Sequence, residues 1–187
     1  MVPSNKVIAI DGPAASGKSS VATRVSKKTG FLHVNSGLMY RALTWSALRA
    51  DIDTNNESKI IDHLNSIEME CIKLNDSLLL HIDGNDPGEE LKSQEVNRSV
   101  SVVAAIKEVR SELVKRQREY LLVSDIVMEG RDIGSVVFPE TPFKFYIDAS
   151  PEVRALRRRG EGGVDDLRER DKLDYSRKVS PLVIPED

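Results

Sequence analysis

The stretch KVIAIDGPAASGKS, residues 6–19, decides the fold. Residues 6–10 are typical of a short, fully buried strand in a parallel sheet. Asp11 and Gly12 end this strand. Apolar residues on one face then predict a helix over 18–28, and Gly30 follows at the position where helices commonly end. A strand, a glycine-containing loop and a helix therefore follow one another directly.

The loop matches the pattern G-x-x-x-x-G-K-[ST] at every fixed position, in the structural context that this motif requires. Its glycines let successive backbone N–H groups converge on one anion, and the helix N-terminus adds partial positive charge. We expect Lys18 to reach the β- and γ-phosphates, and Ser19 to hold Mg²⁺ through its hydroxyl. The residues predicted to bind a nucleoside triphosphate are Gly12, Pro13, Ala14, Ala15, Ser16, Gly17, Lys18, Ser19 and Ser20.

The rest of the chain alternates between strand and helix patterns, which predicts an α/β fold with a mainly parallel sheet and helices on both faces. Two adjacent strand patterns joined by Asn75-Asp76 predict a small antiparallel β insert. We expect a single domain over 1–187, with the insert at about 65–95 and a lid at about 154–170. The expected strands are 31–34, 67–74, 77–82, 126–128 and 143–147, the last two buried, and the expected helices are 37–50, 95–121, one from 151, and 165–175.

The composition narrows the class of protein. Hydrophobic residues make up 40% of the 187 residues, which is enough for a core and excludes global disorder. The net charge of −3 disfavours binding to nucleic-acid polymers. The single cysteine, Cys71, cannot form an intrachain disulfide, and no apolar stretch is long enough to span a membrane. We expect a cytoplasmic monomer.

The motif alone does not say what is done with the triphosphate. A GTPase would carry an Asn-Lys-x-Asp segment, which is absent, and a motor ATPase needs a longer chain. The remainder of the sequence is instead rich in arginine, with seven of the fifteen arginines between positions 154 and 177. Arginines bind phosphate oxygens in pairs and stabilise a phosphoryl group in transfer. A small phosphotransferase whose acceptor carries its own phosphate fits this pattern best.

Two groups of arginines are candidates for that role, each with a plainer alternative. Arg154, Arg157 and Arg158 share one helix face and resemble a lid that closes over the triphosphate, or else they are a solvated surface. The triplet of Arg170, Asp174 and Arg177 lies on one face of the next predicted helix. It is either a binding surface directed into a cleft or a ladder of surface ion pairs.

Two further segments carry three more candidate residues. Arg131 and Asp132 follow a buried strand, and ligands of α/β proteins bind at the carboxyl ends of strands, which favours a functional role. Arg110 lies at the edge of an apolar helix stripe, where an arginine commonly extends its charged end to solvent.

Four segments together resemble the bacterial cytidylate kinases, over nearly the whole chain. The phosphate loop within the first segment is shared with many proteins, whereas the segments 35–41 and 129–134 are far more specific to this family. The segments are Ile10–Ser19, Asn35–Arg41 (NSGLMYR), Glu129–Gly134 (EGRDIG) and Arg170–Arg177 (RDKLDYSR), the last followed by Ser180-Pro-Leu182.

The resemblance implies a P-loop kinase core and transfer of a phosphoryl group from ATP, with Mg²⁺, to CMP or dCMP in pyrimidine nucleotide metabolism. It implies that Ser36, Arg41, Arg131 and Arg177 hold the acceptor phosphate, that Arg110 and Asp132 recognise cytosine, and that Ser101, Arg170 and Asp174 contact the sugar. The catalytic cations would be Lys18, Arg131, Arg170, Arg177 and, from the lid helix, Arg158.

Two positions depart from the family pattern. Position 35 is Asn where the family often has Asp, and position 129 is Glu where Asp is common. The alternatives to a cytidylate kinase are a kinase for another nucleoside monophosphate or small acceptor, and a nucleotide-binding regulatory domain that transfers no phosphate.

Overall fold

The computed structural model describes residues 5–74, 77–160, 167–177 and 181–184, without the side chains of residues 73, 74, 77 and 168–170. The predicted turn Asn75-Asp76 lies outside these ranges. In chain order the elements are β1 (Val7–Asp11), α1 (Lys18–Thr29), β2 (Leu32–Asn35), α2 (Ser36–Arg49), α3 (Glu57–Ser66), β3 (Met69–Leu74), β4 (Ser77–Ile82), η1 (Gly88–Lys92), α4 (Gln94–Val103), α5 (Lys107–Glu119), η2 (Tyr120–Leu122), β5 (Ile126–Gly130), η3 (Ile133–Val137), β6 (Lys144–Tyr146), α6 (Pro151–Gly160) and α7 (Leu167–Ser176).

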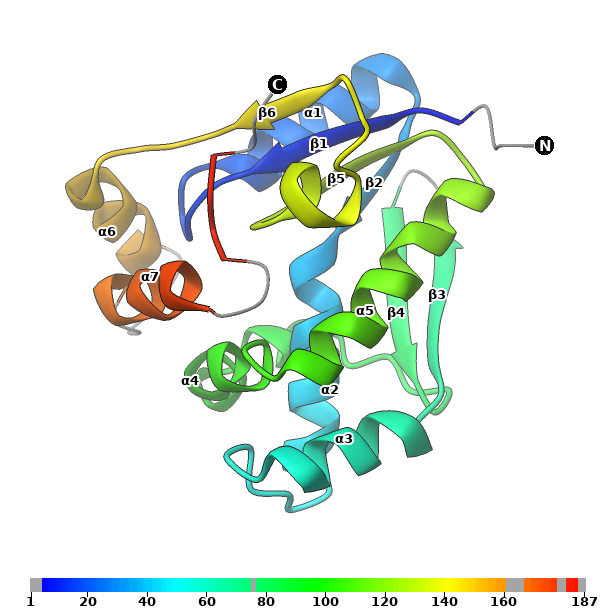
Figure 1. The fold of residues 1–187 in the computed structure, drawn as a ribbon, viewed down its shortest axis with the longest axis vertical. Helices are drawn as coiled ribbons and strands as arrows, with labels where there is room; N and C mark the ends of the chain where they lie inside the picture. Colours follow the sequence, from blue (N-terminus) through cyan, green and yellow to red (C-terminus); the bar gives the residue numbers. More distant parts are fainter. Residues whose placement is uncertain (1–4, 75–76, 161–166, 178–180, 185–187) are drawn as a thin grey trace.

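A four-stranded parallel sheet forms the centre of the fold, in the order β2-β5-β1-β6. All five residues of β5 are buried, because β5 lies between β1 and β2 and is covered on both faces. On one face, Ala22 of α1 packs against Ile10 and Val127. On the other face, α5 and η3 pack over the sheet through residues such as Val114 and Ile133. Helices on both faces of a parallel sheet are therefore confirmed (Figure 1).

The antiparallel insert is also confirmed. Strands β3 and β4 pair from Met69↔Ile82 to Leu74↔Ser77, and the hairpin joins the parallel sheet through the single pair His33↔Ser77. In Figure 1 this hairpin stands beside α5, with α3 beyond its end. A second apolar core fills the space between α2, α3, α4, α5 and the hairpin.

Two sequence predictions are wrong. The helix expected over 95–121 is two helices, α4 and α5, because Ile106 adopts an extended conformation with φ −67° and ψ 123°. The strand expected at 143–147 is not buried. It is β6, at the edge of the sheet, and Phe143 and Phe145 are 44% and 52% exposed.

The sheet places the carboxyl ends of β1, β2 and β5 at one edge, where the phosphate loop, the start of α2 and the segment after β5 meet. Helices α6 and α7 approach the same edge from the end of β6 (Figure 1). No helix in the described ranges is both long and apolar enough to cross a bilayer.

Candidate functional site

The phosphate loop connects β1 to α1, as predicted, and its glycines have a steric reason. Gly12 has φ 147°, and a Cβ at this position would lie 2.0 Å from the carbonyl oxygen of Ile147. Gly17 precedes the first turn of α1 with φ 98°, in the left-handed region. The loop therefore needs glycine at both fixed positions of the motif.

The amino group of Lys18 turns back into this loop. Its Nζ donates to the carbonyl oxygen of Pro13 at 2.6 Å, and the side chain is buried. Burial, together with the nearby charge of Arg131, lowers the pKa of Lys18 well below its usual range. An anion bound in the loop would offset both effects, since it restores a favourable partner for the ammonium group.

Ser19 and Glu129 supply oxygen ligands beside the loop. The Ser19 hydroxyl donates to Oε2 of Glu129 at 2.8 Å, and Glu129 is 3% exposed. A hydroxyl and a carboxylate are the hard ligands that Mg²⁺ accepts when phosphate oxygens complete its coordination. The residues present therefore fit a magnesium ion. In the described part of the chain, no cluster of three or more His, Cys, Asp or Glu is arranged around a metal position.

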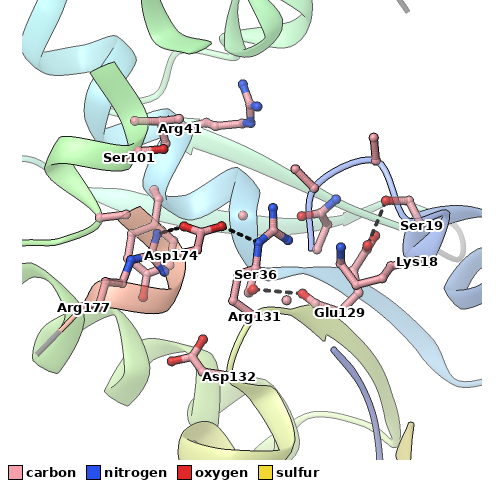
Figure 2. A pocket seen from close by; sticks show the side chains of 18 of the residues that line it. Lys18, Ser19, Ser36, Arg41, Ser101, Glu129, Arg131, Asp132, Asp174 and Arg177 are labelled. Carbon is pink, nitrogen blue, oxygen red and sulfur yellow. Dashed lines mark hydrogen bonds and ion pairs between the residues drawn. The ribbon is translucent and has the colours of Figure 1, made fainter. Parts of the chain in front are cut away.

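Across from the loop, one carboxylate joins two arginines. Asp174 accepts from Nε of Arg131 at 2.8 Å and also forms an ion pair with Nη2 of Arg177 (Figure 2). Asp174 is 2% exposed and the side chain of Arg177 is 6% exposed. The alternative of a surface ion-pair ladder is therefore wrong for this pair. Burial lowers the pKa of Arg177 below its usual value.

Arg110 and Asp132 form a second buried pair. Nη2 of Arg110 is bonded to Oδ2 of Asp132, and Nη1 donates to the carbonyl oxygen of Ala104 at 3.1 Å. The guanidinium lies 5.3 Å from the centre of the Tyr40 ring. Arg110 is 2% exposed, so the plainer alternative, an arginine whose charged end extends to solvent, is wrong.

The segment that carries Arg131 and Asp132 is fixed from β1. Asp11, the last residue of β1, accepts from the backbone N–H of Ile133 at 2.8 Å and of Gly134 at 2.7 Å. Asp11 is 1% exposed, and burial raises its pKa to about 6. One carboxylate thus links the strand before the phosphate loop to the segment after β5.

One cleft, with a volume of about 210 Å³, brings most of the predicted residues together. Ser36 lies at its base and donates to the carbonyl oxygen of Glu129 at 2.8 Å, whereas Arg41 donates to the carbonyl oxygen of Leu91 at 2.8 Å (Figure 2). The predicted residues that line the cleft are Ala14, Ala15, Lys18, Ser19, Ser36, Arg41, Ser101, Arg110, Arg131, Asp132, Arg158, Asp174 and Arg177.

The other predicted residues are placed differently. Arg170 belongs to α7, and its side chain lies outside the described part of the structure. The loop residues Gly12, Pro13, Ser16, Gly17 and Ser20 do not line the cleft.

The arginines of α6 divide into two groups. Arg158 lines the cleft. Arg154 is buried, donates to the carbonyl oxygen of Ala14 at 3.3 Å and pairs with Asp171 of α7 at 2.7 Å. Arg157 donates to the carbonyl oxygen of Ser16 at 2.8 Å. Arg154 and Arg157 therefore hold the phosphate loop from outside, which differs from the shared lid face expected for all three.

Several residues of the site were not among the predicted ones, and Tyr40, Asp11 and Glu129 make the most informative contacts among them. Tyr40 stands in the segment Asn35–Arg41 that carries the resemblance, but its place in an apolar helix pattern predicts only a core residue. Asp11 ends β1 directly before the loop, and Glu129 stands directly before Gly130, the last residue of β5. An acidic residue at the end of a buried parallel strand is a signal that points to this edge of the sheet.

Comparisons with known proteins cover the same residues. A family model described as "Cytidylate kinase" matches residues 8–187. A cytidylate kinase of Caldanaerobacter subterraneus subsp. tengcongensis is 41% identical over 190 residues, which cover 96% of this chain and 83% of that protein. The cytidylate kinase of Bacillus subtilis is 39% identical over 191 residues (96% and 85%), and that of Bacillus cytotoxicus is 41% identical over 191 residues (96% and 85%). The similarity thus extends from the phosphate loop to the arginine side of the cleft.

Proposed function

This chain belongs to the cytidylate kinase family, and on that premise we propose that its cleft transfers the γ-phosphoryl group of ATP to CMP or dCMP, giving ADP and the diphosphate. The observation that carries the proposal is that a single cleft contains the phosphate-loop lysine, Lys18, and a separate group of arginines opposite it. A protein that only senses a triphosphate has no need for a second phosphate site.

The donor nucleotide is proposed to bind with its β- and γ-phosphates in the loop of residues 12–20. The loop N–H groups and Lys18 bind phosphate oxygens, and Arg158 adds a positive charge from α6. Mg²⁺, held by Ser19 and Glu129, would neutralise charge on the phosphate oxygens. No general base is needed, because catalysis of phosphoryl transfer is mainly positioning and charge stabilisation.

The acceptor phosphate is proposed to bind between Ser36, Arg41, Arg131 and Arg177. Two guanidinium groups, from Arg131 and Arg177, already converge on the carboxylate of Asp174, whose side chain is 2% exposed. A phosphate group presents the same kind of charged oxygen acceptors, so this pair of arginines is oriented for an anion before CMP arrives. We assign Ser101, Asp174 and Arg170 to the sugar.

The base is proposed to be read by Asp132 with Arg110. A carboxylate accepts a hydrogen bond from the exocyclic amine of cytosine, whereas uracil presents a carbonyl oxygen at that position. Arg110 fixes the position of Asp132 by direct pairing. A buried polar site rejects the wrong base strongly, because a mismatch leaves its groups unpaired.

We propose that residues 1–187 act as one domain, with an insert at about 65–95 that contains the hairpin and a lid at about 154–170, and that the protein is a cytoplasmic monomer.

The test is a panel of acceptors with Mg-ATP: CMP, dCMP, UMP, AMP and dTMP. We expect CMP and dCMP to be preferred. A preference for UMP or AMP would favour a kinase for a different nucleotide. ATP binding without any acceptor-stimulated formation of ADP would favour a regulatory domain.

The arginine side of the cleft has its own test, Arg131→Ala. Losing a charge-assisted contact to phosphate costs about 3 kcal/mol, so we expect kcat/KM for CMP to fall about 100-fold. The KM for ATP should change by less than about threefold, as read in the same steady-state assay. Arg24→Ala, at an exposed arginine of α1, is the matched control and should leave both parameters unchanged. Normal CMP kinetics in Arg131→Ala would contradict the acceptor site.

A further inference from the structure

The Glu129 side chain is held from two directions. Its Oε2 accepts from the Ser19 hydroxyl at 2.8 Å, and its Oε1 lies 3.1 Å from Nε2 of His33. Glu129 is 3% exposed and the His33 side chain is 17% exposed. Each oxygen of a nearly inaccessible carboxylate therefore has one donor, from a different element of the fold.

The sheet register explains how His33 reaches Glu129. In the parallel pair of β2 and β5, His33 lies beside Val127 and Asn35 lies beside Glu129. Side chains two positions apart on a strand point to the same face, so His33 and Glu129 are diagonal neighbours on one face of the sheet. Contact across this diagonal requires a donor at the distance of Nε2 from the backbone of position 33, and a side chain at position 129 that is longer than Asp.

Holding this carboxylate matters because it is buried. An ionised carboxylate that loses a hydrogen-bond partner in such surroundings is costly, and a carboxylate held by a single hydrogen bond is free to rotate about it. When Nε2 of His33 donates its hydrogen to Oε1, the carboxylate plane is fixed and Oε2 stays directed at Ser19. Without the imidazole, Ser19 would be the remaining side-chain donor in contact with Glu129 among the described residues.

We propose that His33 is a positioning residue that holds the Glu129 carboxylate beside Ser19 and thereby sets how much a divalent cation strengthens nucleotide binding. The inference rests on the proposed function only for the identity of the nucleotide. It also gives a role to the departure at position 129, since a Glu needs a second anchor that a shorter Asp beside Ser19 does not.

The test measures binding and does not require turnover. Isothermal titration calorimetry gives the Kd of ADP with MgCl₂ and with EDTA, and the ratio of the two is the cation-dependent gain in affinity. We expect His33→Leu to reduce this gain about tenfold while the Kd in EDTA stays within twofold of wild type. His33→Gln places an amide N–H where Nε2 lies and should keep the gain, whereas His33→Asn, which is shorter, should lose it.

A double-mutant cycle tests whether the effect passes through Glu129. In Glu129→Asp the carboxylate no longer reaches position 33, so adding His33→Leu to it should change the gain by less than twofold. His81→Leu, on β4 and outside the cleft, is the matched control and should behave as wild type. Urea unfolding of each variant identifies any protein that is not folded. If His33→Leu does not fold, the comparison of His33→Gln with His33→Asn tests the proposal in its place.

An equal cation-dependent gain in wild type, His33→Leu and His33→Asn would overturn the proposal. A loss in His33→Gln as large as in His33→Leu would also overturn it, since the retained donor would then be irrelevant. Phosphoryl transfer to CMP is measured in a separate assay, the acceptor panel with Mg-ATP. Failure of that assay, with the His33 pattern intact, would remove the proposed function and leave this inference standing.

Discussion

Asp11 shows, at the scale of one residue, why the site keeps a charge where burial opposes it. Its two oxygens accept the N–H groups of Ile133 and Gly134, and only an ionised carboxylate accepts two such bonds with both oxygens. Burial nevertheless raises its pKa to about 6. Near neutral pH the ionised form therefore positions Arg131 and Asp132 at a cost in stability.

This cost predicts a particular pH dependence of stability. The folded pKa of about 6 exceeds the ordinary value of 3.8, so between these values the folded protein holds a proton that the unfolded chain has released. The contribution of Asp11 to the free energy of unfolding should be fully present below pH 4. It should fall by about 3 kcal/mol as the pH rises through 6.

Urea unfolding of wild type and Asp11→Asn at pH 4, 5, 6 and 7 measures this contribution. The asparagine does not titrate, so the difference in unfolding free energy between the two proteins should change by about 2 kcal/mol between pH 4 and pH 7, most of the full effect. Other groups titrate alike in both proteins and cancel. Parallel pH profiles would show that Asp11 has the same pKa folded and unfolded.

At the scale of elements, the sequence predicts correctly those helices, strands and loops that are determined by a local residue pattern or a motif. The strand, loop and helix around the phosphate loop form as expected, because their apolar spacing and glycines act locally. The break between α4 and α5 has no such signal. Residues 104–106 are Ala-Ala-Ile, without proline or glycine, and the helical pattern continues across them. The Ala104 carbonyl instead accepts a bond from the side chain of Arg110, a contact that sequence spacing does not reveal.

The candidate site divides in the same way. Lys18, Ser36 and Asp132 belong to motifs and are found from the sequence alone. The contacts of Glu129 with Ser19 and His33 join segments 110 and 96 residues apart, so they depend on sheet order. The same holds for the arginines of α6. Their spacing shows that they share a face, and the fold shows that Arg154 faces Asp171 while Arg158 faces the cleft.

The link between α6 and α7 gives a prediction at this scale. Arg154 and Asp171 are paired at 2.7 Å with side chains 9% and 13% exposed. Removing one partner leaves a nearly buried charge unpaired, so Arg154→Ala and Asp171→Ala should each lower the free energy of unfolding by about 3 kcal/mol. The double variant should lose about 2 kcal/mol less than the two single losses together, because it leaves no isolated charge.

Urea unfolding of the four proteins gives this coupling directly. Arg159→Ala, an exposed arginine on the same helix, serves as the control and should change stability by less than about 0.5 kcal/mol. Additive losses at Arg154 and Asp171 would mean that the two helices are not held together by this pair.

At the scale of the whole molecule, the charge of the cleft is opposite to that of the protein. The chain carries a net charge of −3, yet the cleft is lined by six cationic side chains and three acidic ones. A concave surface with low-dielectric walls concentrates its local field, so a small dianion is attracted despite the overall negative charge. Attraction of this kind is reduced by salt, because the Debye length falls from about 10 Å at 0.1 M to about 3 Å at 1 M.

The affinity for CMP should therefore depend on salt through its phosphate. We expect the Kd of CMP, measured by isothermal titration calorimetry, to rise about tenfold between 0.05 M and 0.5 M KCl, as paired guanidinium contacts are screened. Cytidine, which lacks the phosphate, should compete with CMP with an affinity that changes less than twofold. Arg177→Ala should reduce the salt dependence for CMP as well as the affinity, because it removes one of the charges that salt screens. A salt dependence equal for CMP and cytidine would mean that the arginine side of the cleft does not bind the acceptor phosphate.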